Sequence, residues 1–172
     1  MDKQKKHYLY VGLVLACIGV VTSAAIVGVN ELTKNRIIEN QQKSKNEAMA
    51  KVFKDCQFGE TTNVEGVEYL VSYTTATKDG VEQGDVYYTT GKNMYGGISM
   101  MVAVYLNGNL GQISLVENTQ SFASTVEDNY LKPYNNNKRS IDDVTCGATY
   151  GATLIRNMAK AAQTHYKERK GL

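Results

Sequence analysis

The stretch MVAVYLNGNLGQISLV, residues 101–116, decides the fold class. Two runs rich in Val, Leu and Ile flank Asn107-Gly108, a dipeptide that favours the positive φ angles of a tight hairpin turn. The sequence therefore predicts strands over 98–105 and 110–117, joined as an antiparallel hairpin.

The region before this hairpin has the same character. Residues 64–75 and 86–90 are rich in Val, Thr and Tyr, and short glycine-containing turns separate them from their neighbours. The region after it is helical in pattern. A helix is expected over 125–134, stopped by Pro133, followed by a solvated loop over 135–139. Strands followed by helices predict an α+β fold with an antiparallel sheet and flanking helices.

The chain begins with an apolar segment. Residues 8–30 carry no charge, which is long enough for a helix to cross a membrane. Lys3, Lys5 and Lys6 precede it, so the positive-inside rule places the N-terminus in the cytoplasm and the remainder outside. Cleavage near residues 23–25, or lipidation at Cys17, would be the alternatives. The apolar run continues well past Cys17, which favours an uncleaved anchor.

Four parts are therefore expected along the chain: a cytoplasmic N-terminus (1–7), a transmembrane helix (8–30), a helical connecting stalk (31–55) and an extracytoplasmic domain (56–172). The net charge is +2, and the first seven residues hold three of the 19 basic and one of the 17 acidic residues. The remainder balances at 16 against 16, so no basic patch is implied and no nucleic-acid binding is expected. The apolar segment makes membrane lipid an expected partner.

A small-residue turn, DVTCGATYGA over 143–152, opens directly into the last predicted helix. The first N–H groups of a helix lack intrahelical acceptors and lie at the positive end of its dipole, so they form an anion site. Gly147 and Ala148 would let a phosphate approach the backbone, and Thr149 would offer a hydroxyl beside it. An ordinary helix cap explains the same residues equally well. The apolar positions of the helix recur at helical spacing: Leu154, Ile155, Met158, Ala159, Ala162, His165 and Tyr166.

This turn resembles the flavinylation motif of the FMN-binding domain found in the G subunit of Rnf complexes and in the C subunit of sodium-pumping NADH:quinone reductases. Asp143, Gly147, Ala148 and Thr149 match the motif, and Cys146 stands in its Ser/Thr place. The resemblance implies that FMN is joined to Thr149 through a phosphoester made by a separate flavin transferase. It also implies that Asp143 serves recognition by that transferase.

Two further segments bear on the resemblance. Tyr95-Gly96-Gly97-Ile98 is similar to a Tyr-Gly-Gly element that lies near the flavin in the family. Tyr95 would then pack on the flavin, while Gly96 and Gly97 would allow the backbone to approach it. The loop 117–122 stands where the family commonly has a His-x-Glu-Thr-Pro-Gly segment, and only Thr119 matches.

The implied function is that of an electron carrier in a membrane-bound, ion-translocating ferredoxin:NAD oxidoreductase, with the other subunits of that complex as partners. No nucleophile, base and orienting residue can be identified together, so no independent catalytic site is expected. Cys56 and Cys146 could form a disulfide, and the chain has no Cys-x-x-Cys metal spacing. A quinone-reductase subunit, a subunit without flavin that braces its partners and a membrane-anchored binding module without cofactor remain as alternatives.

Overall fold

The computed structural model describes residues 3–172, without the side chains of residues 3–6, 9, 31, 32 and 35. The chain divides into two units, residues 1–43 and 44–172, and each is described by itself.

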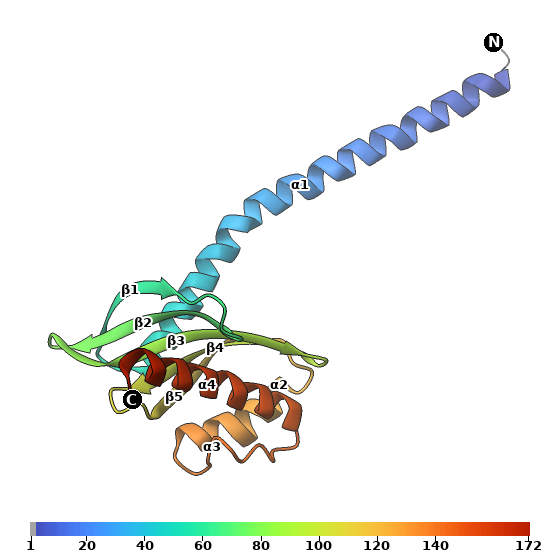
Figure 1. Ribbon diagram of the computed structural model, residues 1–172. Coiled ribbons are helices and arrows are strands. Elements are labelled where there is room, and N and C mark those ends of the chain that lie inside the picture. The colour runs from blue at the N-terminus through green and yellow to red at the C-terminus, as the bar shows by residue number, and fades with distance from the viewer. Residues whose placement is uncertain (1–2) are drawn as a thin grey trace. The chain divides into compact units, whose positions relative to one another are not determined.

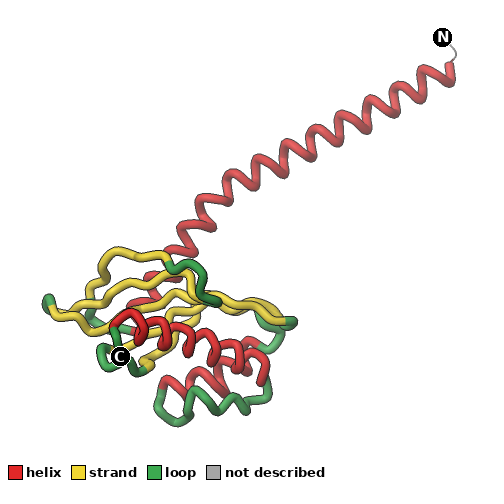
Figure 2. Tube along the Cα trace, viewed as in Figure 1, coloured by secondary structure: helices red, strands yellow, loops and turns green. Residues whose placement is uncertain are grey.

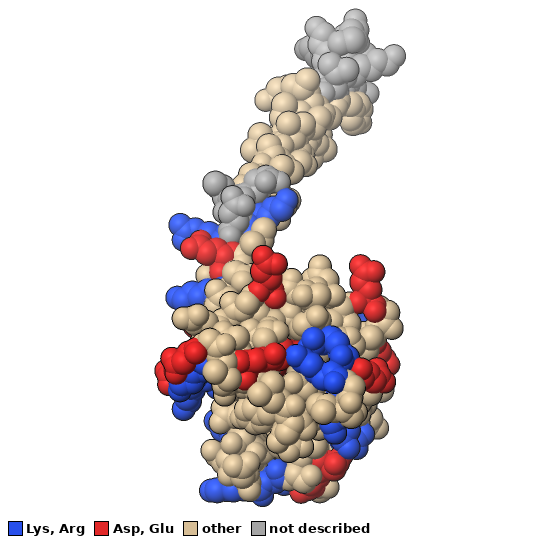
Figure 3. Space-filling view, turned by 60° about the vertical axis from the view of Figure 1, so that its left-hand side comes forward, with Lys and Arg blue, Asp and Glu red and all other residues tan. Residues whose placement is uncertain are grey.

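A single helix, α1 (Lys3–Val52), accounts for the described part of the first unit and continues into the second. Its segment Tyr10–Asn30 has a mean hydropathy of 2.4 and is long and apolar enough to cross a membrane. In Figure 3 this part of the helix shows neither basic nor acidic side chains among the atoms that are not grey. The prediction of an N-terminal apolar helix is confirmed, and its crossing of a membrane over 8–30 stays a prediction.

The second unit is built on one five-stranded antiparallel sheet (Figure 1). The strands follow one another in space in chain order, so every connection is a hairpin or a short loop. This confirms the predicted α+β class. The strands are β1 (Gln57–Asn63), β2 (Leu70–Lys78), β3 (Val81–Asn93), β4 (Gly96–Tyr105) and β5 (Leu110–Asn118).

The turns show where the predicted strands were right and where they were wrong. The hairpin at Asn107-Gly108 is confirmed, because the Gly108 N–H donates to the Tyr105 carbonyl at 2.8 Å and Gly108 has φ +74°. The single strand expected over 64–75 is wrong. Gly66 and Tyr69 have positive φ values, so residues 64–69 form a loop and β2 begins only at Leu70. The preceding strand, β1, was not predicted because its residues are polar and mostly exposed.

The sheet has an apolar cluster on each face. Along β4, Ile98, Met100, Val102 and Val104 belong to one cluster, whereas Met101 and Ala103 belong to the other. Helix α4 (Thr149–Lys170) covers the first face (Figures 1 and 2), and its apolar positions are buried as predicted except for the half-buried His165. The end of α1 and the residue after it pack on the other face through three buried side chains: Ala48, Val52 and Phe53.

Pro133 does not stop a helix, contrary to the prediction. It lies in the first turn of α3 (Lys132–Asn135), which continues from α2 (Ala123–Val126) through a π-helical turn, η1 (Glu127–Leu131). A proline is tolerated in the first turn of a helix because that N–H needs no intrahelical acceptor. The π turn just before α3 is wider than an α-helical turn, so the backbone changes its geometry there and accommodates Pro133.

The outer edge of β5 is closed by two side chains from α3. Asn135 donates to the Ile113 carbonyl at 2.8 Å and accepts from the Ile113 N–H at 2.9 Å, as a neighbouring strand would. The Tyr134 hydroxyl donates to the Gly111 carbonyl at 2.9 Å. Burial raises the pKa of Tyr134 to about 12, so this hydroxyl stays protonated at neutral pH and keeps its bond.

Candidate functional site

The predicted attachment residue lies at the start of α4. Ala148 is the N-cap residue and Thr149 is the first residue of the helix. The first intrahelical bond runs from the Ala152 N–H to the Ala148 carbonyl, at 3.1 Å. The N–H groups of the three residues before Ala152 therefore have no acceptor within the helix. The Thr149 side chain is exposed beside them.

The loop that leads to this helix is held by Arg139. Its guanidinium donates to the carbonyls of Asp143 at 3.1 Å and Thr145 at 2.7 Å, and it lies 3.5 Å from the Asp143 carboxylate. The carboxylate also accepts the Thr145 N–H at 3.2 Å. The Arg139 guanidinium and the Asp143 carboxylate thus order the loop around Asp143. The sequence had predicted Arg139 to be part of a solvated loop.

Cys146 does not face the helix start. Its side chain is buried in the cluster beneath α4, and its carbonyl accepts a hydrogen bond from Asn129 at 3.2 Å. Cys56 packs against the cluster on the opposite face of the sheet. Both thiols are free in the structure, so the disulfide that the sequence left open is not formed.

A pocket of about 240 Å³ surrounds Thr149. It contains four residues that the sequence predicted from two separate segments, namely Tyr95 from one and Gly147, Ala148 and Thr149 from the other. The pocket adds Gln120, Phe122, Tyr150 and Gly151. The volume is below the roughly 300–1,000 Å³ that is typical of small-molecule sites. It suits a phosphate and the portion of a ligand next to it, with a larger ring extending to the surface.

Three aromatic rings gather at this pocket. The Tyr95 ring lies 5.5 Å from that of Tyr150 and 6.3 Å from that of Phe122. Tyr150 is 64% exposed and Phe122 is 56% exposed, so their faces are open to a planar ligand. Neither residue was predicted as part of the site. Position is their only sequence signal. Tyr150 directly follows Thr149, and Phe122 is the last residue of the loop 117–122.

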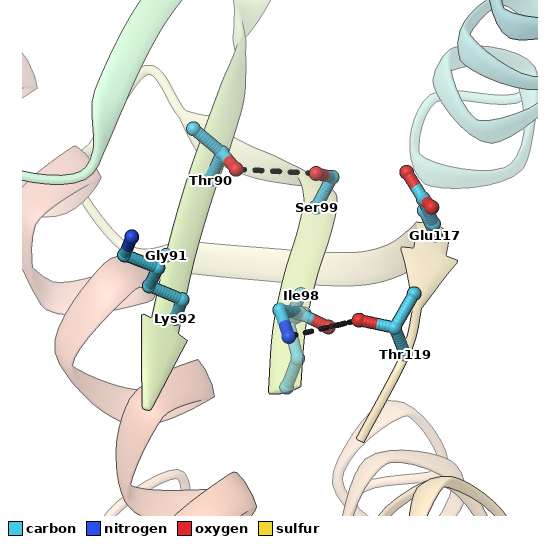
Figure 4. A pocket seen from close by; sticks show the side chains of 8 residues that line it. Thr90, Gly91, Lys92, Ile98, Ser99, Glu117 and Thr119 are labelled. Atoms are coloured by element: carbon cyan, nitrogen blue, oxygen red, sulfur yellow. Dashed lines mark hydrogen bonds between the residues drawn. The ribbon is translucent and has the colours of Figure 1, made fainter. Parts of the chain in front are cut away.

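The other predicted residues lie beside this pocket. Gly97 and Thr119 line a second pocket of about 460 Å³ (Figure 4), where the Thr119 hydroxyl accepts the Gly97 N–H at 2.9 Å. Figure 4 shows that residues of the adjoining strands β3, β4 and β5, with Thr119 just after β5, line it. The full lining is Thr90, Gly91, Lys92, Gly97, Ile98, Ser99, Glu117 and Thr119.

Gly96 lines neither pocket, and the fold itself requires it. Gly96 has φ +132°, and a Cβ placed there would lie 2.3 Å from the Thr119 carbonyl oxygen. A Cβ on Gly97 would meet nothing closer than 3.5 Å. Gly96 therefore lets the chain itself pass close to the Thr119 backbone, which is a different role from the predicted approach to flavin.

Gly96→Ala is expected to lower the free energy of unfolding by about 2–4 kcal/mol, because it combines backbone strain with a steric clash. The neighbouring Gly97→Ala is the matched control and is expected to change it by less than about 1 kcal/mol. Urea denaturation of the full chain in detergent, followed by circular dichroism, measures both. Equal losses in the two variants would contradict this assignment.

Both charge signs are interspersed on the face of residues 44–172 that Figure 3 shows. Among the described residues, the side chains with the largest pKa shifts are tyrosines, and none of them lines the pocket at Thr149. Burial raises the pKa of Tyr87, whose hydroxyl pairs with His165 Nδ1 at 3.0 Å, and the pKa of Tyr130, whose hydroxyl donates to the Ile141 carbonyl. These groups stay neutral and serve the core.

Comparison with known proteins finds a family match at the N-terminal part of the chain. The family model described as the RnfG N-terminal region matches residues 1–52. This confirms the resemblance over the apolar helix and the residues after it. The match does not include the Tyr95 segment or the turn at Thr149. No curated protein matches the chain.

Proposed function

Since residues 1–52 carry an RnfG-type N-terminal region, we propose that the chain is the electron-carrying G subunit of an Rnf-type ferredoxin:NAD oxidoreductase. In this proposal FMN is joined through its phosphate to the Thr149 hydroxyl. The observation that carries it is the pocket in which Thr149, Gly147, Ala148 and Tyr95 meet, although Tyr95 lies more than fifty residues before the others.

The residues present fit such a group. A phosphate on the Thr149 oxygen would lie beside N–H groups that have no acceptor within the helix, at the positive end of a 22-residue helix. The rings of Tyr95, Phe122 and Tyr150 would offer stacking surfaces for a planar ring. Bound FMN supplies reversible uptake of electrons, and the protein supplies its position and surroundings.

Covalent attachment has a physical rationale if the domain lies outside the cytoplasm. A freely dissociating flavin would be lost by diffusion there, whereas a tethered one stays at a constant effective concentration. We propose this orientation from Lys3, Lys5 and Lys6 before the apolar helix, with the N-terminus in the cytoplasm. The remaining subunits, the lipid bilayer and the flavin transferase are then the partners.

The RnfG-type N-terminal region favours an Rnf complex over a sodium-pumping quinone reductase. One experiment distinguishes the flavin-carrying subunit from the alternative of a bracing or binding subunit without cofactor.

The full chain is produced in membranes with and without a co-expressed flavin transferase, and denatured samples are examined for flavin fluorescence in the gel. We expect a fluorescent band at the mass of the chain only with the transferase. A dark band in both samples would support the cofactor-free alternative.

A further inference from the structure

We propose that Asn93 is the positioning residue of the attachment site, because its side-chain amide fastens the first turn of α4 to the β3–β4 turn. This inference rests on the proposed attachment of flavin at Thr149. Asn93 is the last residue of β3 and comes just before the Met94–Tyr95 turn.

The Asn93 amide joins three segments of the chain. Its Nδ2 donates to the Tyr150 carbonyl in the first turn of α4, at 3.2 Å. Its Oδ1 accepts the Tyr95 N–H at 2.8 Å and the Gln120 Nε2–H at 2.9 Å. A single side chain therefore holds the turn that carries Tyr95, the loop after β5 and the helix that carries Thr149.

Gln120 strengthens this arrangement. It is only 7% exposed, and its Nε2 also donates to the Gly96 carbonyl at 2.7 Å. The loop after β5 also packs against the helix. A Cβ on Gly151 would lie 3.1 Å from Gln120 Oε1 and 2.6 Å from Val126 Cγ2. The glycine thus allows Gln120 to lie directly against the first turn of α4.

These contacts hold the backbone that carries Thr149. Tyr150 follows Thr149 directly, so the bond to the Tyr150 carbonyl ties the first turn of α4 to the β3–β4 turn next to the attachment residue. The same amide fixes the backbone of Tyr95, whose ring lies across the pocket. In the attachment step the Thr149 oxygen attacks the flavin-bearing phosphorus of a flavin dinucleotide donor. The donor's pyrophosphate bond breaks, a nucleoside monophosphate leaves, and the hydroxyl loses its proton as the phosphoester forms. Such a transfer depends steeply on placement, since a displacement of about 1 Å can cost a large factor in rate.

Asn93 could instead serve only to stabilise the β3–β4 turn, and two substitutions distinguish this role from the proposed link to α4. The bond that Oδ1 accepts from the Tyr95 N–H forms an Asx-type turn, which aspartate makes as well as asparagine. An aspartate oxygen can also accept the bond from Gln120 Nε2. The bond to Tyr150 needs the amide N–H, which aspartate lacks. Asn93→Asp therefore preserves the turn and removes the link to α4, whereas Asn93→Ala removes both.

The test measures the initial rate of flavin attachment to the full chain in detergent. Purified flavin transferase and its flavin donor are supplied, and intact mass is followed over time. Thermal midpoints are recorded in parallel by circular dichroism. We expect Asn93→Ala and Asn93→Asp both to be flavinylated about tenfold more slowly than the unaltered chain. The deficit of Asn93→Asp should persist at high salt, where its added charge is screened.

Asn135→Ala is the matched control. Asn135 also bonds the backbone through its side-chain amide, but it does so at the β5 edge. We expect it to lower the thermal midpoint at least as much as Asn93→Ala while keeping the unaltered rate. The proposal is overturned if Asn93→Asp is flavinylated at the unaltered rate, or if Asn135→Ala is slowed as much as Asn93→Ala. If the unaltered chain takes up no flavin, the proposed function itself fails and this inference fails with it.

Discussion

Replacing Thr149 by alanine is expected to abolish covalent flavin attachment completely while leaving the fold intact. The Thr149 oxygen is the proposed bonding atom, and alanine offers none in its place. The side chain is exposed and Ala148 is the helix N-cap, so the helix loses no side-chain cap. Flavin fluorescence of the denatured band and the intact mass of the chain both measure the loss.

Two variants make this result specific. Thr149→Ser keeps a hydroxyl at the same position and is expected to carry flavin. Thr145→Ala removes another exposed hydroxyl within the same turn and is expected to carry flavin as the unaltered chain does, because the ordering contacts of Thr145 use its backbone. A flavin-bearing Thr149→Ala chain would place the attachment elsewhere.

Arg169→Ala is expected to lower the free energy of unfolding by about 3 kcal/mol, because it leaves a buried carboxylate without its counter-charge. Asp85 is fully buried in β3 and is paired with Arg169 at the end of α4. The Thr75 hydroxyl would still donate to the Asp85 carboxylate, at 2.8 Å, but it carries no charge. The Arg169 guanidinium also lies 4.2 Å from the centre of the Tyr73 ring, so its packing is lost too. Urea denaturation of the full chain in detergent measures the change.

The neighbouring Lys170 provides the control. Its ion pair with Glu82 joins two partly exposed side chains, so Lys170→Ala is expected to cost less than about 1 kcal/mol. Replacing both members of the buried pair, as Asp85→Asn with Arg169→Met, is expected to recover part of the loss because no bare charge stays buried. Equal costs for Arg169→Ala and Lys170→Ala would show that the buried pair is no stronger than a surface pair.

Much of the fold could be predicted because it depends on local patterns. The uncharged stretch specifies the apolar helix, Asn107-Gly108 specifies a hairpin, and helical spacing after Thr149 specifies the buried face of α4. These signals need only neighbours in sequence. The order of elements then sufficed for the α+β class.

The errors have physical causes that a local pattern does not contain. β1 is a polar edge strand without alternation, and it forms because β2 offers it backbone hydrogen bonds. Pro133 is accommodated because the helix before it widens into a π turn. Residues 64–69 contain apolar and β-branched residues typical of a strand, but Gly66 and Tyr69 turn the chain.

The candidate site was predicted only in part. The motif and the Tyr95 segment share one pocket, whereas Gly97 and Thr119 lie in the adjoining one and Cys146 is buried beneath the helix. The polar residues that bring the segments together, Asn93, Gln120 and Arg139, carry no motif of their own. The roles of Asn93 and Gln120 depend on hydrogen bonds across 24 to 57 residues of chain, and that of Arg139 depends on a folded loop; sequence spacing reveals neither.

The most direct test of the central claim is the intact mass of the full chain taken from its native membrane. The account predicts a mass that exceeds that of the polypeptide by one FMN less one water, and it predicts that the added mass maps to the peptide containing Thr149. A chain that weighs no more than its amino acids, in cells that contain the flavin transferase, would contradict the account.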